Sequence, residues 1–242
     1  IVTGRGQEIL KRAQKIKIEI KNINELAQRF SKGLTHPLSM GIIPTISPYL
    51  LPLILPRLQK EFTNLELKIE EGQSQSLLNK VRDGDLDMAI LALPYDLNGL
   101  VSFTFWEEDF YWISHNKNKN AGKREIKASE LEHSKLMLLE DGHCLKDHIL
   151  DACNISSASN YSIKASSLST LIQLVKGRMG TTLVPKMALK ELIGNKRSLS
   201  VSHLNEPGPH REIALITRAN YPGMESIDLL LDYFKDSLNG LN

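Results

Sequence analysis

The sequence predicts an α/β protein in which two α/β subdomains follow one long helix. Three observations support this fold class. A segment rich in helix formers, Glu8–Phe30, lies near the start of the chain. Beyond it, short apolar runs typical of strands alternate with helical patterns. A polar run from Asn116 to Arg124 then separates two such blocks, so we interpret it as a crossover between subdomains.

The composition is that of a globular protein without a membrane span. Hydrophobic residues make up 41% and charged residues 24% of the 242 positions, which are ordinary values. No apolar run reaches the roughly 18 residues that a membrane helix needs. The net charge of +2 is too small to indicate a general nucleic-acid surface. Because the chain starts at Ile1 without a targeting segment, we expect an internal fragment of a longer protein.

The first element, expected within residues 1–35, is a linker or dimerisation helix. Apolar residues recur along one stripe of this helix: Ile9, Ile16, Ile20, Ile23, Ala27 and Phe30. Such a stripe needs a partner, and a second copy of the same helix is our first interpretation. The alternative is that the stripe packs back onto its own domain. Gly33 and Pro37 are expected to end the helix.

The first α/β block, residues 36–115, contains most of the expected subdomain I. We expect strands at Leu38–Ile43, Leu65–Glu70, Met88–Leu93, Val101–Trp106 and Phe110–Ser114. Helices are expected at about Pro48–Phe62 and Gln73–Asp83. Pro52 and Pro56 lie inside the first helical pattern, so that helix should start late or bend.

The second block, residues 116–212, is the expected subdomain II and holds both cysteines. We expect strands at Lys135–Leu139, Tyr161–Ala165 and Thr181–Val184, and helices at Leu145–Cys153 and Leu168–Lys176. The βα alternation indicates mainly parallel sheets in both blocks. Residues 213–242 add a strand, Glu212–Thr217, and a helix, Met224–Leu238. This tail should cross back to complete subdomain I and leave a ligand cleft between the halves.

Several motifs resemble the LysR-type transcriptional regulators over nearly the whole chain. The stretch PLSMGIIPTISPYLLPLILP from Pro37 to Pro56 is similar to the start of that family's effector domain. The segment GRMGTTLVP, from Gly177 to Pro185, resembles a segment in the second half of that effector domain. The segment VTGRGQEIL, from Val2 to Leu10, resembles the start of the family's linker helix. The resemblance implies a periplasmic-binding-protein-like type 2 fold of two α/β subdomains. It further implies a homodimer or homotetramer that binds DNA through an absent N-terminal helix-turn-helix domain, with RNA polymerase as a further partner.

Within this family, LMLLEDGHCLKDHILDAC from Leu136 to Cys153 is similar to the hydrogen peroxide sensors of the OxyR group. The resemblance implies that Cys144 is the peroxidatic cysteine, that Cys153 is the resolving cysteine, and that the oxidised form carries their disulfide. It also implies peroxide-binding or thiolate-activating residues, which are Thr45, Ser74, His143, Lys146 and Asp147. Ser74 stands where that pattern usually has threonine, and Lys146 where it usually has arginine; both retain the chemical type.

The residues around Cys144 point independently to an activated thiol. Peroxide is attacked by a thiolate, whereas free cysteine is mostly protonated at neutral pH. Cys144 follows Gly-His at the expected start of a helix, where amide dipoles favour an anion, and Lys146 is two residues away. Asp147 can orient His143 or Lys146, although the helix dipole alone also explains an acid there. The hydroxyls of Thr45 and Ser74 likewise suit helix capping as well as ligand binding. The alternative for each cysteine is that it is a small buried hydrophobic residue.

The spacing of the cysteines predicts a switch rather than a structural disulfide. Nine residues of α-helix separate side chains by a rise of about 13.5 Å, whereas a disulfide needs Cα atoms within about 7 Å. If the segment Leu145–Cys153 is helical when reduced, oxidation must unwind it. Reduction by a cellular thiol reductant fits a cytoplasmic protein.

Two other functions stay open on the sequence alone. One is a small-metabolite-binding LysR-type effector domain with incidental cysteines. The other is a peroxidase, which needs sustained turnover, whereas a sensor consumes one peroxide per switching event. We favour a regulator and not an enzyme, with no cofactor and no metal site, since no metal-ligand spacing is present.

Overall fold

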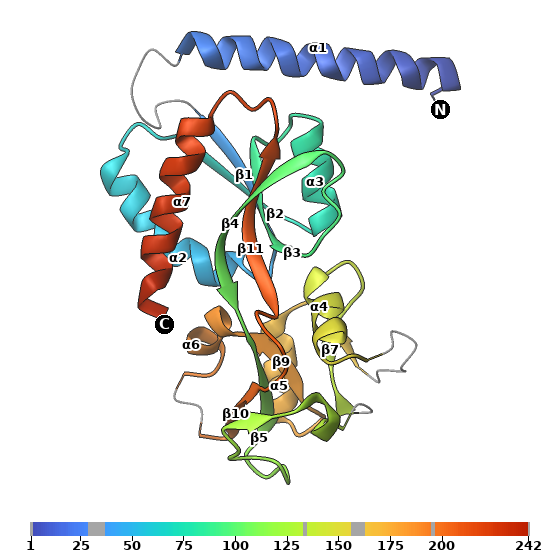
Figure 1. Ribbon diagram of the computed structural model, residues 1–242, viewed down its shortest axis with the longest axis vertical. Coiled ribbons are helices and arrows are strands. Elements are labelled where there is room, and N and C mark those ends of the chain that lie inside the picture. Colours follow the sequence, from blue (N-terminus) through green and yellow to red (C-terminus); the bar gives the residue numbers. More distant parts are fainter. Residues whose placement is uncertain (1, 29–36, 133–134, 156–162, 195–196, 242) are drawn as a thin grey trace.

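The computed structural model describes residues 2–28, 37–132, 135–155, 163–194 and 197–241. It contains one long helix and two sheets with helices packed on them (Figure 1). Helix α1, Gly4–Gln28, lies across one end of the molecule, beside the five-stranded sheet. The four-stranded sheet lies at the opposite end. The expected order of one helix followed by two α/β units is therefore confirmed.

The five-stranded sheet has the order β2-β1-β3-β11-β4. Its strands are β1 (Leu38–Ile42), β2 (Leu67–Glu71), β3 (Met88–Leu93), β4 (Leu100–Glu108) and β11 (Arg211–Arg218). β1 runs parallel to β2 and β3, while β11 is antiparallel to β3 and β4. Helices α2 (Ser47–Glu61), α3 (Ser74–Arg82) and α7 (Met224–Leu238) pack around this sheet. The C-terminal strand and helix thus return to the first unit, as predicted.

The four-stranded sheet has the order β6-β10-β5-β9. It comprises β5 (Phe110–His115), β6 (Glu125–Ile126), β9 (Thr182–Pro185) and β10 (Leu199–Leu204). A separate short pair joins β7 (Leu138–Leu139) to β8 (Lys164–Ala165). The helices of this unit are α4 (Cys144–Ala152), α5 (Leu168–Lys176) and the short α6 (Leu189–Leu192). Of the expected strand Tyr161–Ala165, the part up to position 162 lies outside the described residues.

Strand β5 belongs to the second sheet, where it pairs with β9 and β10. Our grouping of residues 36–115 placed it in subdomain I, so the sheet pairing moves that boundary to the junction of β4 and β5. The other junction precedes Arg211, where β11 begins. Glu108 and Arg211 are partners in the β4–β11 register, so the chain passes between the two sheets at two adjacent points.

The expected helix Pro48–Phe62 is confirmed as α2, which begins at Ser47, ahead of both internal prolines, so it does not start late. Two other features differ from the expectations. The second sheet is not mainly parallel, because β5 is antiparallel to both of its neighbours. Strand β10 and helix α6 were not predicted. The segment LSVSHL of β10 is short, and most of its side chains are only half-buried, so its apolar pattern is a weak signal.

Helix α1 leaves its apolar stripe uncovered. Ile9, Ile16, Ile20 and Ile23 are 55–68% exposed, so these residues do not pack back onto their own domain. A different part of α1 touches the domain, where Lys17 Nζ lies 2.9 Å from Asp85 Oδ1. The predicted stripe position Phe30 and the helix end at Gly33 lie outside the described residues, as does the side chain of Ala27.

Candidate peroxide-reactive thiol site

Helix α4 begins at Cys144, and the preceding Gly-His pair shapes its entry. Gly142 has φ of 96°, a left-handed conformation that glycine adopts without strain. A Cβ atom at this position would lie 2.6 Å from Gln73 Oε1, so a larger residue would also displace the end of the Gln73 side chain. His143 is the N-cap residue, with extended backbone. Cys144 therefore occupies the first helical position, where backbone N–H groups are unpaired and favour negative charge.

A narrow hollow in front of Cys144 brings four predicted site residues together. It is lined by Thr45 from the loop after β1, Ser74 at the start of α3, and His143 and Cys144 at the start of α4. All four are buried. The free volume for a water-sized molecule is about 0 Å³. A small molecule could therefore reach the thiol only if these elements move slightly.

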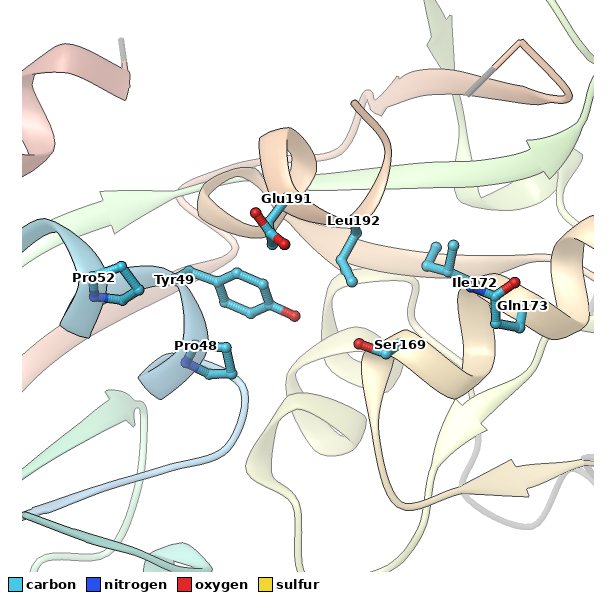
Figure 2. A pocket seen from close by; sticks show the side chains of 8 residues that line it. All are labelled: Pro48, Tyr49, Pro52, Ser169, Ile172, Gln173, Glu191 and Leu192. Carbon is cyan, nitrogen blue, oxygen red and sulfur yellow. The ribbon is translucent and has the colours of Figure 1, made fainter. Parts of the chain in front are cut away.

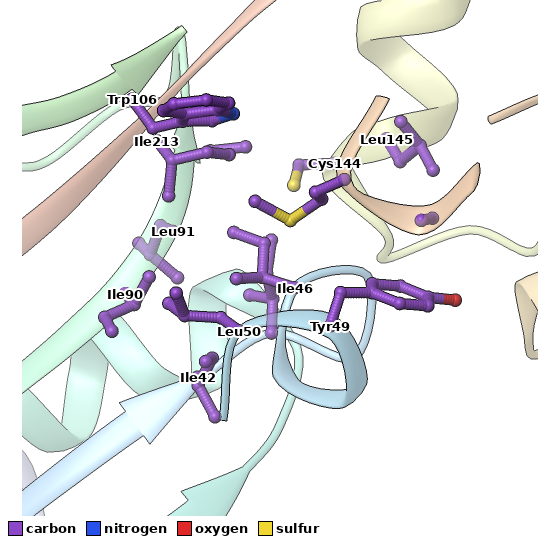
Figure 3. Packing of buried hydrophobic residues seen from close by; sticks show 14 of the residues in the cluster. Ile42, Ile46, Tyr49, Leu50, Ile90, Leu91, Trp106, Cys144, Leu145 and Ile213 are labelled. Carbon is purple, nitrogen blue, oxygen red and sulfur yellow. The ribbon is translucent and has the colours of Figure 1, made fainter. Parts of the chain in front are cut away.

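Burial is the main influence on the Cys144 thiol. The residue is 3% exposed and lies in an apolar cluster with Ile46, Leu50 and Ile213 (Figure 3). This desolvation raises the pKa of Cys144 above its usual value. Opposing effects, which lower the pKa, come from the Ser74 hydroxyl, the charge of Arg211 and the backbone of Ala92.

The Ser74 hydroxyl is the polar group with most influence on the thiol. Its oxygen is buried and forms no regular hydrogen bond to any described residue in the resting structure. It nevertheless faces the Cys144 sulfur, and as a donor to the thiolate it lowers the thiol pKa.

Arg211 is the site residue that the sequence analysis missed. Its guanidinium is fully buried at the start of β11, where Nε and Nη2 donate to Glu108 Oε1 at 2.8 and 2.7 Å. Nη1 donates to Thr45 Oγ1 at 3.3 Å. The other carboxylate oxygen, Glu108 Oε2, accepts a 2.7 Å bond from Met187 N in the second unit. An arginine at a strand end is ordinary in sequence, and only the β4–β11 register reveals the pairing with Glu108.

Lys146 and Asp147 do not lie as the predicted thiolate-activating role requires. The Lys146 ammonium is bonded to Asp141, which also accepts from Lys164 Nζ at 2.8 Å. These two lysines hold the pKa of Asp141 at about 2. The charge of Asp147 raises the pKa of Cys144, which is the opposite of activation. The nearby cation that lowers the thiol pKa is Arg211, not Lys146.

Cys153 lies at the other end of α4, as its C-cap residue. It is buried, and desolvation followed by the charge of Glu206 raises its pKa to about 12. Both cysteines are free thiols. The expected helix between them is confirmed, since α4 spans Cys144–Ala152.

His148 ties the middle of α4 to the first unit of the molecule. It is 4% exposed, and its Nε2 lies 3.1 Å from the carbonyl oxygen of Pro94, just after β3. Its Nδ1 is buried and has no partner among the described residues. Burial lowers the pKa of His148, so the ring is neutral and Nε2 donates to Pro94.

A larger cavity, of about 400 Å³, lies between α2 and the helices α5 and α6. Figure 2 shows the Tyr49 ring directed across this space toward Ser169, with Glu191 and Leu192 on the α6 side. Burial raises the pKa of Tyr49 to about 12. This cavity is separate from the hollow at Cys144.

Two kinds of feature were not found in the described part of the chain. No three His, Cys, Asp or Glu side chains there are grouped so as to hold a metal ion. No helix there is both long and apolar enough to cross a membrane.

Comparison with curated proteins finds transcriptional regulators. The chain is 35% identical over 236 residues to the HTH-type transcriptional regulator EstR of Acinetobacter baylyi, covering 97% of this chain and 78% of that protein. It is 30% identical over 243 residues to the DNA-binding transcriptional dual regulator OxyR of Escherichia coli, covering 99% and 79%. A probable hydrogen peroxide-inducible genes activator of Mycobacterium avium is 33% identical over 221 residues, covering 90% and 71%.

Solved structures of OxyR proteins share the fold. A cysteine-to-serine variant of Corynebacterium glutamicum OxyR with bound hydrogen peroxide has a TM-score of 0.82 at 32% identity, covering 100% of this chain and 76% of that one. The reduced regulatory domain of OxyR from Pseudomonas aeruginosa has a TM-score of 0.76 at 29% identity, covering 84% and 97%. The sheets and helices described above are consistent with the type 2 periplasmic-binding-like fold.

The family model for the LysR substrate binding domain matches residues 31–239, which include both sheets and both cysteines. The relatives found are transcriptional regulators of the LysR and OxyR kind rather than enzymes. This chain therefore belongs to the LysR-type regulators, and its similarities include those to OxyR peroxide sensors.

Proposed function

We propose that this chain is the regulatory part of a peroxide-sensing transcription factor, switched by a reversible disulfide between Cys144 and Cys153. One observation carries the proposal: the two buried thiols lie at opposite ends of α4, and Cys144 faces Ser74 and the charge of Arg211. Relatives whose names refer to hydrogen peroxide support the assignment. Thr45, Ser74 and His143 would bind the peroxide.

The chemistry proceeds in two balanced steps. The Cys144 thiolate attacks one peroxide oxygen and breaks the O–O bond, which gives a sulfenic acid and, after proton uptake by the leaving hydroxide, water. The sulfur of Cys153 then attacks the sulfenic sulfur, forms the S–S bond and releases a second water. A cellular dithiol or glutathione returns both residues to thiols by disulfide exchange.

The second step requires a change of fold. The nine positions from Cys144 to Cys153 correspond to a helical rise of about 13.5 Å, and the Cα atoms must come within about 7 Å. At least part of α4 must therefore unwind. The hydrogen bond between His148 and Pro94 would break as α4 moves away from the first unit. The contact between the two units would therefore change.

The change would reach DNA through the assembly of several copies. The exposed isoleucine stripe of α1 is suited to pairing with the same helix of a second copy. We propose a homodimer or homotetramer that binds DNA through a helix-turn-helix domain ahead of α1, with RNA polymerase as a partner. We also propose two subdomains, with β5 assigned to the second and the redox cysteines in the second.

Mass spectrometry after one equivalent of peroxide tests the thiol roles. The wild type should form the Cys144–Cys153 disulfide. Cys153→Ser should hold a sulfenic acid at Cys144 that a dimedone-type probe traps, and Cys144→Ser should give neither product. Trapping at Cys153 in Cys144→Ser, with none in Cys153→Ser, would reverse the two roles.

Hydrogen exchange tests the fold change. Oxidation should raise exchange across α4 and leave the described part of α1 unchanged. If the disulfide forms with α4 still protected, the thiols meet by another route and the unwinding mechanism is wrong.

The 400 Å³ cavity favours a second candidate, a small-metabolite effector domain with incidental cysteines. The volume of this cavity is within the usual range for small-molecule sites. In addition, the name of the relative EstR does not refer to peroxide. The same peroxide experiment separates the two candidates. An effector domain of this kind would form no disulfide at stoichiometric peroxide.

A further inference from the structure

A cavity of about 220 Å³ lies in the second unit, distant from the thiols and beside the exit of β5. Figure 1 shows this end of the molecule on the side opposite α1. Four basic residues line it: His115 at the end of β5, Lys117 in the following turn, Lys135, and Arg178 in the loop from α5 to β9. Asn118 and Thr181 add neutral polar groups. Its lining holds no carboxylate among the described residues.

The charge of these cations is only partly compensated. Lys135 Nζ lies 2.7 Å from Glu132 Oε2, and Glu132 also pairs with Lys119. Lys117 and Arg178, in contrast, have no carboxylate partner among the residues that the structure describes. The cavity therefore has an excess of positive charge that an anion would neutralise.

His115 adds a hydrogen-bond donor. Its Nδ1 accepts a 3.1 Å bond from the backbone N–H of Lys117, so the neutral ring carries its hydrogen on Nε2. Partial burial lowers the pKa of His115, and the charges of Arg178 and Lys117 lower it further. Both cations therefore act electrostatically on the same ring. An anion bound here would offset this effect and raise the His115 pKa again.

Arg178, beside the cavity, has a backbone conformation that glycine normally adopts. Its φ is 62°, a left-handed conformation that is strained for a residue with a Cβ. The turn is fixed by bonds from Arg178 N to Val175 O and from Met179 N to Leu174 O, at 3.0 and 3.1 Å. An arginine in this place is a reason to look for a function of its side chain.

An unpaired donor lies in the adjoining hollow. Trp112 is 2% exposed, and its indole N–H has no partner in the described part of the chain. It lines a smaller hollow that shares Asn118, Lys135 and Thr181 with the cavity. That hollow also contains the carboxylates of Glu130 and Glu132, which are paired with lysines. A buried donor without an acceptor is costly, and a ligand or water oxygen would satisfy it.

We propose that this cavity is a second ligand site, which binds the phosphate group of a small metabolite through Lys117, Arg178 and His115. The three donor residues line one partly open volume of about 220 Å³, which suits a phosphate and a few further atoms. A nucleic-acid backbone would need cations spread along a surface. The site is independent of the thiol chemistry, so it would let the regulator respond to a metabolite as well as to peroxide.

Calorimetric titration of the reduced chain with inorganic phosphate, at fixed ionic strength, tests the site. We expect saturable binding of one phosphate, which Arg178→Gly weakens by about tenfold or more, since a charge-assisted hydrogen bond is lost. Glycine suits the positive φ, so this variant should keep its fold. Lys117→Gln should weaken binding similarly, whereas Lys68→Gln, which removes an exposed cation from β2, should not.

Two further arms identify the occupant. Glycerol phosphate should bind at least as well as inorganic phosphate if a metabolite is the natural ligand; weaker binding would assign the site to free phosphate. A short single-stranded oligonucleotide that competes with phosphate and binds more tightly would replace the proposal with a nucleic-acid contact. Absence of saturation, or equal weakening by Lys68→Gln, would show diffuse charge attraction and overturn the site.

Discussion

Cys144 and Cys153 are both buried thiols at the ends of one helix, and their surroundings differ in polarity. Cys144 has Ser74, Arg211 and a backbone group that oppose the effect of burial on its pKa. At Cys153, burial and Glu206 act in the same direction and raise the pKa to about 12. In the proposed switch, this difference would set the order of reaction. Cys144 would become a nucleophile where it lies, whereas Cys153 would have to move out of its buried position first.

Removing the Arg211 charge should weaken this difference most. Arg211→Met leaves Glu108 as a buried carboxylate without its cation, which should cost about 3–5 kcal/mol in the free energy of unfolding. It should also raise the Cys144 pKa and slow the reaction with peroxide. Urea unfolding and a stopped-flow peroxide assay measure the two effects.

The double variant Arg211→Met, Glu108→Gln separates stability from reactivity. It should recover much of the stability, because no buried charge is left unpaired, while the slow peroxide reaction persists. Recovery of both properties together would show that Arg211 acts on Cys144 only by holding the fold.

The raised pKa of Cys153 should make stability depend on alkaline pH. The folded chain keeps this thiol protonated up to a pKa of about 12, whereas the unfolded chain loses the proton near 9.0. The stability contributed by the neutral thiol is therefore complete below pH 9 and is lost as pH rises toward 12. At pH 10.5 the wild type should have lost about 2 kcal/mol more than Cys153→Val. Urea unfolding at pH 8 and 10.5 measures this difference, and parallel curves for the two proteins would contradict it.

Loss of the Ser74 hydroxyl should have a smaller effect, on Cys144 alone. Ser74→Ala removes the donor that opposes burial, so the peroxide rate at pH 7 should fall by about tenfold. Ser74→Thr keeps the hydroxyl and is the matched control. Alkylation rates of Cys153, measured in a Cys144→Ser background, should not change with either substitution.

Lys146 should matter least. Because its ammonium is bonded to Asp141, whose carboxylate offsets its charge, Lys146→Gln should change the peroxide rate by less than about twofold. Lys164→Gln, which removes the other lysine on Asp141, is the comparison. A tenfold loss of the peroxide rate in Lys146→Gln, with no such loss in Lys164→Gln, would support the thiolate-activating role that was predicted for Lys146 from its position in the sequence.

Local sequence patterns predicted the helices and strands around the thiols well. They could not predict which strands and side chains far apart in the sequence would pair. Helix α5 and helix α7 have the predicted bounds, because their apolar periodicity is strong and buried. Strand β5 was placed in the wrong sheet, since its sequence does not reveal that its partners are β9 and β10. Arg211 was not predicted as a site residue for the same reason. Distance along the chain is a poor guide to electrostatic distance once β11 has crossed back beside β4.

The helical form of α4 also affects which oxidation events at Cys144 would lead to a response. In the proposed switch the thiols are held apart, so a sulfenic acid at Cys144 would give no signal until the helix opens and the His148–Pro94 hydrogen bond breaks. During that interval a reductant could return the sulfenic acid to the thiol without any change in the assembly. The stability of the nine-residue helix would then set how long an oxidation must last to have an effect, and α4 would make the response insensitive to brief exposure.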